Sequence, residues 1–155
     1  MRGFLLGRIR AAGPVTSHVS PHTATNMRAY DPDRTPDPKL WFGLDEQLRM
    51  VLVEAHHKAA NVKLPNVKAH AAFHAIIENQ VAMQHPPVVR AMARLAKQGL
   101  SRHDCIHAIA WVLVQHFHET ATSPEPAAAS STLGARYDAA VERLTAAEWR
   151  AQAVE

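Results

Sequence analysis

The chain has 155 residues, of which 47% are hydrophobic and 20% charged, so it can form one domain with a buried core and is not an intrinsically disordered chain. Its single cysteine, Cys105, excludes an internal disulfide and a multi-cysteine zinc motif, and it fits a reducing compartment, so the cytoplasm is the expected location. The net charge of +3 is too small to indicate a nucleic-acid surface. The unusual feature is the content of 11 histidines.

Residues 1–38 show no sustained periodicity and end in a stretch rich in proline and aspartate. Arg2, Arg8 and Arg10 surround an apolar run that is too short for a signal peptide or a membrane span. We therefore predict a disordered N-terminal extension over 1–38 and no membrane interaction. A transit-like leader is the alternative, because no acidic residue precedes Asp31.

Apolar residues recur at helical spacing in five segments after this extension. Pro86 and Pro87 break the chain after the second segment, because proline lacks the backbone N–H and clashes with the preceding turn. Gly99 is suited to end the third segment, and Ser101 is suited to cap the fourth. The predicted helices cover about 43–60, 66–84, 87–98, 101–118 and 135 onward.

This pattern predicts an all-α fold, a compact bundle of four helices with an additional C-terminal helix. The expected organisation is a helical domain over 39–119, a linker over 120–134 and the C-terminal helix over 135–155. A homo-oligomer is compatible with such a composition.

The apolar spacing also predicts which face of a helix points inward. The inner face of the first helix is expected to contain Leu44, Leu48, Val51, Leu52 and Ala55. The inner face of the fourth is expected to contain Ile106, Ala110, Leu113, Val114 and Phe117.

The second predicted helix contains His70, His74 and Glu78 at positions i, i+4 and i+8. At 100° per residue, the three side chains span only about 80° of the helix circumference. Ile77 and Val81 fall within or beside the same arc, so the three polar residues lie on or at the edge of the core-facing side. The outward arc is expected to hold residues such as Ala75 and Asn79.

The fourth predicted helix repeats this spacing with His103 and His107, both in the middle of its apolar face. Such histidines need partners, because burying an unpaired polar group costs about 1–3 kcal/mol. If helices joined by short breaks run antiparallel, the second and fourth helices are parallel. His103 and His107 then lie level with His74 and Glu78.

Imidazole nitrogens with one carboxylate favour a divalent transition metal, with zinc or iron preferred, and disfavour calcium and magnesium. The predicted ligands are His70, His74, Glu78, His103 and His107. Glu78 is alternatively a catalytic general base off the metal. If the protein is a metal-dependent enzyme, the metal has an open coordination position and Glu78 is a ligand or the base. The other hypotheses are a structural metal, a metal carrier or sensor, and a metal-free histidine network in an interaction module.

Other polar residues are assigned less specific roles. His56 borders the apolar face of the first helix as a candidate additional donor, whereas His57 is expected to face solvent. Cys105 projects away from the histidine pair and is expected to be a buried, inert thiol. The turn at Gly99 resembles that of a helix-turn-helix, but the following helix has few exposed side chains suited to base edges, which argues against nucleic-acid binding.

Three stretches resemble a bacterial family of small proteins of unknown function, sometimes found beside zinc-binding SEC-C segments. They are His70 to Gln80 (HAAFHAIIENQ) with Pro86-Pro87, Gly99 to His107 (GLSRHDCIH), and Leu144 to Arg150 (LTAAEWR). The resemblance covers a third to half of the chain, and residues 1–40 depart from it. It implies a helical domain in which the four histidines and Glu78 act as one unit, and it implies no particular reaction.

Overall fold

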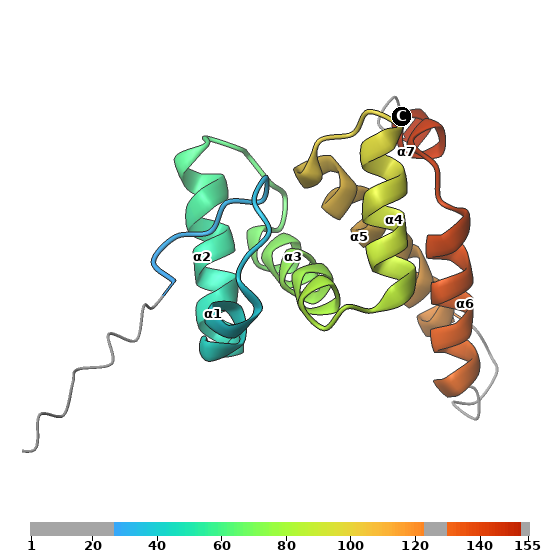
Figure 1. Ribbon diagram of the computed structural model, residues 1–155, viewed down its shortest axis with the longest axis horizontal. Helices are drawn as coiled ribbons and strands as arrows, with labels where there is room; N and C mark the ends of the chain where they lie inside the picture. Colours follow the sequence, from blue (N-terminus) through green and yellow to red (C-terminus); the bar gives the residue numbers. More distant parts are fainter. Residues whose placement is uncertain (1–26, 123–129, 153–155) are drawn as a thin grey trace, which may run out of the picture.

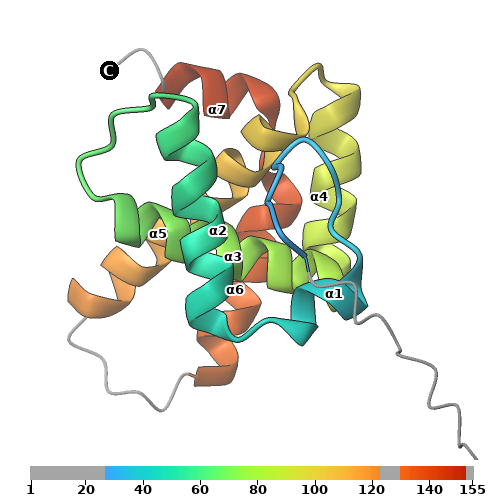
Figure 2. The same cartoon turned by 90° about the vertical axis from the view of Figure 1, so that its left-hand side faces the viewer.

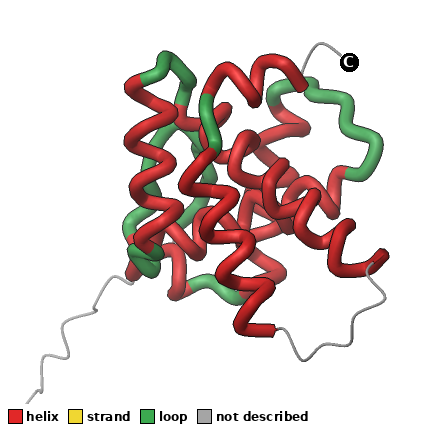
Figure 3. Tube along the Cα trace, turned by 90° about the vertical axis from the view of Figure 1, so that its right-hand side faces the viewer, coloured by secondary structure: helices red, strands yellow, loops and turns green. Residues whose placement is uncertain are grey.

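The computed structural model describes residues 27–122 and 130–152, which form seven helices (Figure 1). They are α1 (Pro38–Gly43), α2 (Glu46–Ala59), α3 (Val67–Ala82), α4 (Pro86–Lys97), α5 (Arg102–Thr122), α6 (Ser130–Arg143) and α7 (Ala146–Gln152). Helices and loops account for all of the described chain, with no strand in it (Figure 3). The predicted all-α class is therefore confirmed. Among the described residues, none of the helices has the length and apolarity needed to cross a bilayer.

Capping side chains set the starts of several helices. Asp37 accepts hydrogen bonds from two backbone N–H groups at the start of α1, Asp45 accepts one at the start of α2, and Asn66 accepts one at the start of α3. Ser101 accepts a bond from the backbone N–H of Asp104 at 3.0 Å and donates its hydroxyl to the Asp104 carboxylate at 2.9 Å. The predicted cap of α5 is thus present, and these bonds satisfy N–H groups that a helix leaves unpaired.

Helix α3 occupies the centre of the molecule. Whereas α2, α4 and α6 stand upright in both views, α3 runs across them (Figures 1 and 2). It packs against α1 and α2 on one side and against α4 and α5 on the other. The expected outward arc is therefore covered at Ala75 and Asn79. Ala75 is buried, and the Asn79 amide oxygen accepts a hydrogen bond of 2.7 Å from the Trp41 indole N–H.

Two apolar clusters flank α3. The larger one joins α3 to α4, α5, α6 and α7 through fully buried residues such as Ile77, Leu95, Ile109 and Val141. The smaller one surrounds Trp41, on the side of α1 and α2. Because α3 contributes to both clusters, the polar side chains at its borders are shielded from solvent by elements on either side.

The N-terminal segment 27–37 is packed onto the helices, so the predicted disordered extension is wrong for these residues. Tyr30 is 4% exposed and belongs to the Trp41 cluster, and Pro32 is also buried. The segment has no periodicity of its own, and its position comes from contacts with distant residues. Residues 1–26 lie outside the described residues.

Helix α2 buries a different face from the predicted one. Val51 is 49% exposed and Leu48 is 40% exposed, whereas Val53 and His57 are buried. The apolar spacing identified a helix correctly but not the side that α3 covers. The predicted inner face of α5 is also wrong in its C-terminal half, where Val114 is 38% exposed and Phe117 is 50% exposed.

The C-terminal helices share the main core and do not form a separate unit after a linker. Helix α5 continues to Thr122, α6 begins at Ser130, and a break at Leu144 precedes α7. Tyr137, Val141 and Leu144 are buried in the same cluster as α4 and α5. Of the predicted linker over 120–134, both ends are helical, and residues 123–129 lie outside the described residues.

Candidate metal centre

Three helices bring histidine side chains to one place beside α3. His57 comes from α2, His74 from α3, and His103 and His107 from α5. One ring nitrogen of each lies within 4.8 Å of the others. We call these four residues the histidine quartet. His57 and His74 are buried, and the two α5 residues are half-buried, so the quartet is enclosed on one side and more accessible on the other.

The Nε2 atoms of the quartet face one another at short distances. His57 Nε2 lies 3.3 Å from His103 Nε2, and His74 Nε2 lies 2.9 Å from His107 Nε2. His70 adds a fifth nitrogen, since its Nε2 is 3.0 Å from that of His57. Nitrogens bound at about 2.0–2.1 Å to one ion are separated by about 3.3 Å in a tetrahedron and about 3 Å as neighbours in an octahedron. These three distances match such ligand-to-ligand separations, whereas the quartet as a whole is spread over up to 4.8 Å.

The ring of His57 has a defined protonation pattern. Its Nδ1 lies 2.9 Å from the backbone carbonyl oxygen of Val53, one turn earlier on α2. A carbonyl oxygen only accepts, so the hydrogen must be on Nδ1. In the neutral ring, the Nε2 that faces His70 and His103 therefore presents a lone pair.

Burial favours the neutral form of four of these rings, those of His70, His74, His103 and His107. Loss of solvation lowers the pKa of His70 to about 4, with further lowering by His57 and His103, and it lowers the pKa of His107 to about 3, with His103 as the next cause. The pKa values of His74 and His103 are lowered for the same reason. Neutral imidazole is the form that binds a metal.

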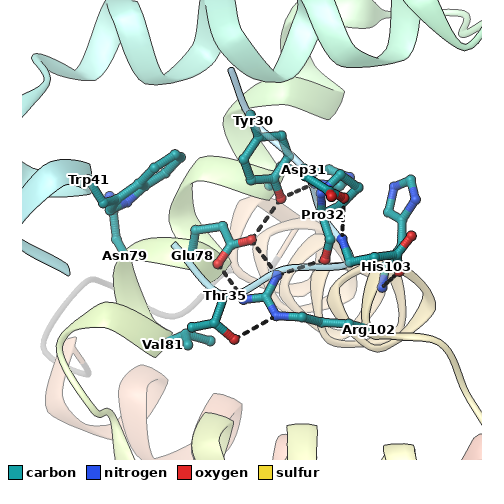
Figure 4. Close-up of polar contacts among 12 residues, drawn as sticks. Tyr30, Asp31, Pro32, Thr35, Trp41, Glu78, Asn79, Val81, Arg102 and His103 are labelled. Carbon is teal, nitrogen blue, oxygen red and sulfur yellow. Dashed lines mark hydrogen bonds and ion pairs between the residues drawn. The ribbon is translucent and has the colours of Figure 1, made fainter. Parts of the chain in front are cut away.

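The Glu78 carboxylate is held by Arg102 and Tyr30 (Figure 4) and is not part of the quartet. Its two oxygens accept hydrogen bonds of 2.8 and 2.7 Å from the Arg102 guanidinium, and the Tyr30 hydroxyl donates to Oε1 at 2.7 Å. Only 1% of Glu78 is exposed. This geometry gives no support to the predicted roles of Glu78 as metal ligand or catalytic base, because Glu78 is not among the residues whose ligand atoms converge and its carboxylate pairs with Arg102 instead.

The N-terminal segment is fastened to the start of α5 next to the quartet (Figure 4). Arg102 donates to the Pro32 carbonyl oxygen at 2.7 Å and to the Thr35 hydroxyl at 3.2 Å. The backbone N–H of His103 donates to the Asp33 carboxylate at 3.2 Å. Burial, and then the Glu78 carboxylate, raise the pKa of Tyr30 far above its ordinary value, so its hydroxyl stays protonated.

Compared with the sequence-based prediction, the structure brings together His74, His103 and His107, places His70 beside them, and adds His57. The expectation that His57 faces solvent is wrong, because α2 packs on α3 through the face of Val53 and His57. His57 follows Val53 by four residues, and this spacing was the one signal that could have found it. His56 is only partly buried, with its ring centroid 6.0 Å from that of His103.

Two further side chains of metal-binding type, Cys105 and His85, lie away from the quartet. Cys105 is fully buried in the core, where burial raises its thiol pKa to about 11, which agrees with an inert thiol. His85 pairs with Asp138 on α6 at 2.8 Å.

The chain matches no protein-family model, no curated protein and no solved structure. Its function is therefore inferred from the geometry of its own residues.

Proposed function

We propose that the protein binds a divalent transition metal, zinc or iron, through the histidine quartet, with His70 as a fifth donor. The observation that carries the proposal is the convergence of His57, His74, His103 and His107, from three helices, with ring nitrogens within 4.8 Å of one another. Histidine is the commonest protein ligand for such ions, and four or five imidazoles without thiolate fit zinc, iron, copper or nickel.

A metal-free hydrogen-bond network explains the contacts of His57 less well than a bound metal ion does. The single Nε2 lone pair of His57 faces two nitrogens, those of His70 and His103, at 3.0 and 3.3 Å. One lone pair accepts one well-directed hydrogen bond, so two ring N–H donors would have to share it, or two lone pairs would face each other. A cation that accepts lone pairs from all three rings removes this conflict.

The accessible side of the quartet favours metal-dependent chemistry as a second candidate function. His70, His103 and His107 are only partly buried, so a bound ion could keep a coordination position open to solvent on their side. Such an ion would act as a Lewis acid or redox centre. The general base would have to be a group other than Glu78, because Arg102 and Tyr30 hold that carboxylate.

Elemental analysis of the purified full-length protein tests the proposal. We expect about one equivalent of zinc or iron in the wild type, and metal affinity lowered more than about 100-fold in His74→Ala or His107→Ala, because loss of a ligand exceeds the 10–100-fold effect of losing an outer partner. Cys105→Ser is the control and should keep the metal. Equal loading of all three variants, or a wild type that takes up no metal on titration, would refute the proposed site.

A further inference from the structure

A continuous series of hydrogen bonds links α5 to the quartet through the N-terminal segment, and Figure 4 shows its part from Arg102 through Glu78 to Tyr30. Arg102 holds the Glu78 carboxylate, the Tyr30 hydroxyl donates to Glu78 Oε1 at 2.7 Å, and the Tyr30 oxygen lies 3.1 Å from His74 Nδ1. The far nitrogen of the same ring, His74 Nε2, is the atom that lies 2.9 Å from His107. This series of hydrogen bonds therefore ends at His74 Nδ1, the ring nitrogen that does not face His107.

The hydrogens in this series can be placed by counting donors. Arg102 has donors only, so the Glu78 carboxylate accepts from it and also accepts the hydrogen of Tyr30. Tyrosine has one hydroxyl hydrogen, and it is used on Glu78, so towards His74 the phenol oxygen acts as an acceptor. His74 Nδ1 must therefore be the donor, which leaves the lone pair of the neutral ring on Nε2.

We propose that Tyr30 is a positioning residue that holds His74 in the tautomer protonated at Nδ1, so that the Nε2 lone pair points at the metal. The inference rests on the proposed function and assigns a role to residues outside the ligand set. Glu78 and Arg102 act on His74 indirectly, through Tyr30, because they orient the single hydroxyl hydrogen of Tyr30 away from His74. Metal-binding histidines commonly donate their second ring N–H to such a partner, which fixes ring orientation and tautomer.

The same contacts make segment 27–37 part of the metal centre. Tyr30 comes from this segment, and Arg102, which anchors Glu78, also holds the segment at the carbonyl oxygen of Pro32. Tyr30 is buried among rings, with its centroid 5.9 Å from that of Trp41 and 6.0 Å from that of His74. Packing against neighbouring rings therefore fixes the Tyr30 ring, and hydrogen bonds fix its hydroxyl group.

Nitrogen-15 NMR of the metal-free wild-type protein tests the proton placement without reference to any metal. Ring nitrogens with and without hydrogen have well-separated shifts, so the tautomer of His74 can be determined directly. We expect His74 to carry its hydrogen on Nδ1, and in Tyr30→Phe we expect a mixture of tautomers. A wild-type His74 protonated at Nε2 would overturn the inference.

Zinc affinity, measured by competition with a chromophoric chelator, tests the consequence for binding. Tyr30→Phe keeps the ring and removes the hydroxyl, so we expect a 10–100-fold loss of zinc affinity. Tyr137→Phe is the matched control, because Tyr137 is also buried and also donates its hydroxyl to a side chain, Gln80 at 2.7 Å, but lies in the other core cluster. Tight wild-type binding that Tyr30→Phe leaves unchanged would overturn the inference alone, whereas a wild type that binds no zinc would refute the proposed function.

Discussion

The adjacent histidines His56 and His57 show how single positions on one helix differ in role. His57 is 2% exposed and places its Nε2 within 3.3 Å of two other rings, whereas His56 is partly buried and packs edge-on against His57 with ring centroids 5.3 Å apart. Successive residues on a helix point about 100° apart, so only one of the two can face the quartet.

This difference makes the pair a sensitive test of which histidines bind metal. In His57→Ala we expect zinc affinity to fall more than about 100-fold, because a ligand is lost. In His56→Ala we expect a change of less than about threefold, because its ring only contacts the ligands from outside. Isothermal titration of zinc into each metal-free variant measures both values. Equal losses in the two variants would contradict the assignment of His57 as the α2 ligand.

At the level of helices, the sequence predicted α3 and α5 well because their histidines and apolar residues follow the helical period over several turns. The pairing of His74 with His107 was predicted from this spacing together with the assumption that helices joined by short breaks run antiparallel. The face of α2 was predicted wrongly, because Leu48 and Val51 follow the same period as a buried stripe although α3 covers the side of Val53. Periodicity finds a helix, whereas the covered face depends on its neighbours.

The face of α2 can be tested by making the same substitution on its two sides. Val53 is fully buried and Val51 is 49% exposed. We expect Val53→Ala to lower the free energy of unfolding by about 2 kcal/mol, because it removes buried apolar atoms and leaves a cavity, and Val51→Ala to change it by less than about 0.5 kcal/mol. Urea denaturation followed by circular dichroism measures both. The reverse order would mean that α2 buries the face predicted from its sequence.

The contacts of Glu78 show which parts of the site the sequence does not predict. Glu78 was placed correctly on the buried side of α3, but its partners Tyr30 and Arg102 lie 48 and 24 residues away along the chain. Tyr30 belongs to a segment without periodicity, so no local pattern could connect it with His74. The candidate ligands on regular helices were therefore largely predictable, and the residues that contact them from the N-terminal segment were not.

For the whole molecule, the quartet ties together α2, α3 and α5, which are far apart in sequence. The lowered pKa values of His70, His74, His103 and His107 link folding to pH. The pKa is about 4 for His70 and about 3 for His107 in the folded protein, and about 6.5 for both in the unfolded chain. Between about pH 6.5 and pH 4 the unfolded chain binds more protons than the folded one, so stability must decrease as the pH falls through this range.

We therefore expect the metal-free protein to lose stability on acidification from pH 7.5 to pH 5, by up to about 1.4 kcal/mol per pH unit for each such histidine, and by less for partly exposed rings such as His70 and His107. Urea denaturation at a series of pH values measures the slope. In His107→Gln the slope should be smaller, because one titrating group is removed. Zinc at 100 times its dissociation constant should add about 2.7 kcal/mol at pH 7.5, and this gain should shrink at pH 5, because protons compete for the ring nitrogens. A metal-free protein whose stability is constant from pH 7.5 to pH 5 would contradict the presence of buried, neutral histidines at the junction of these three helices.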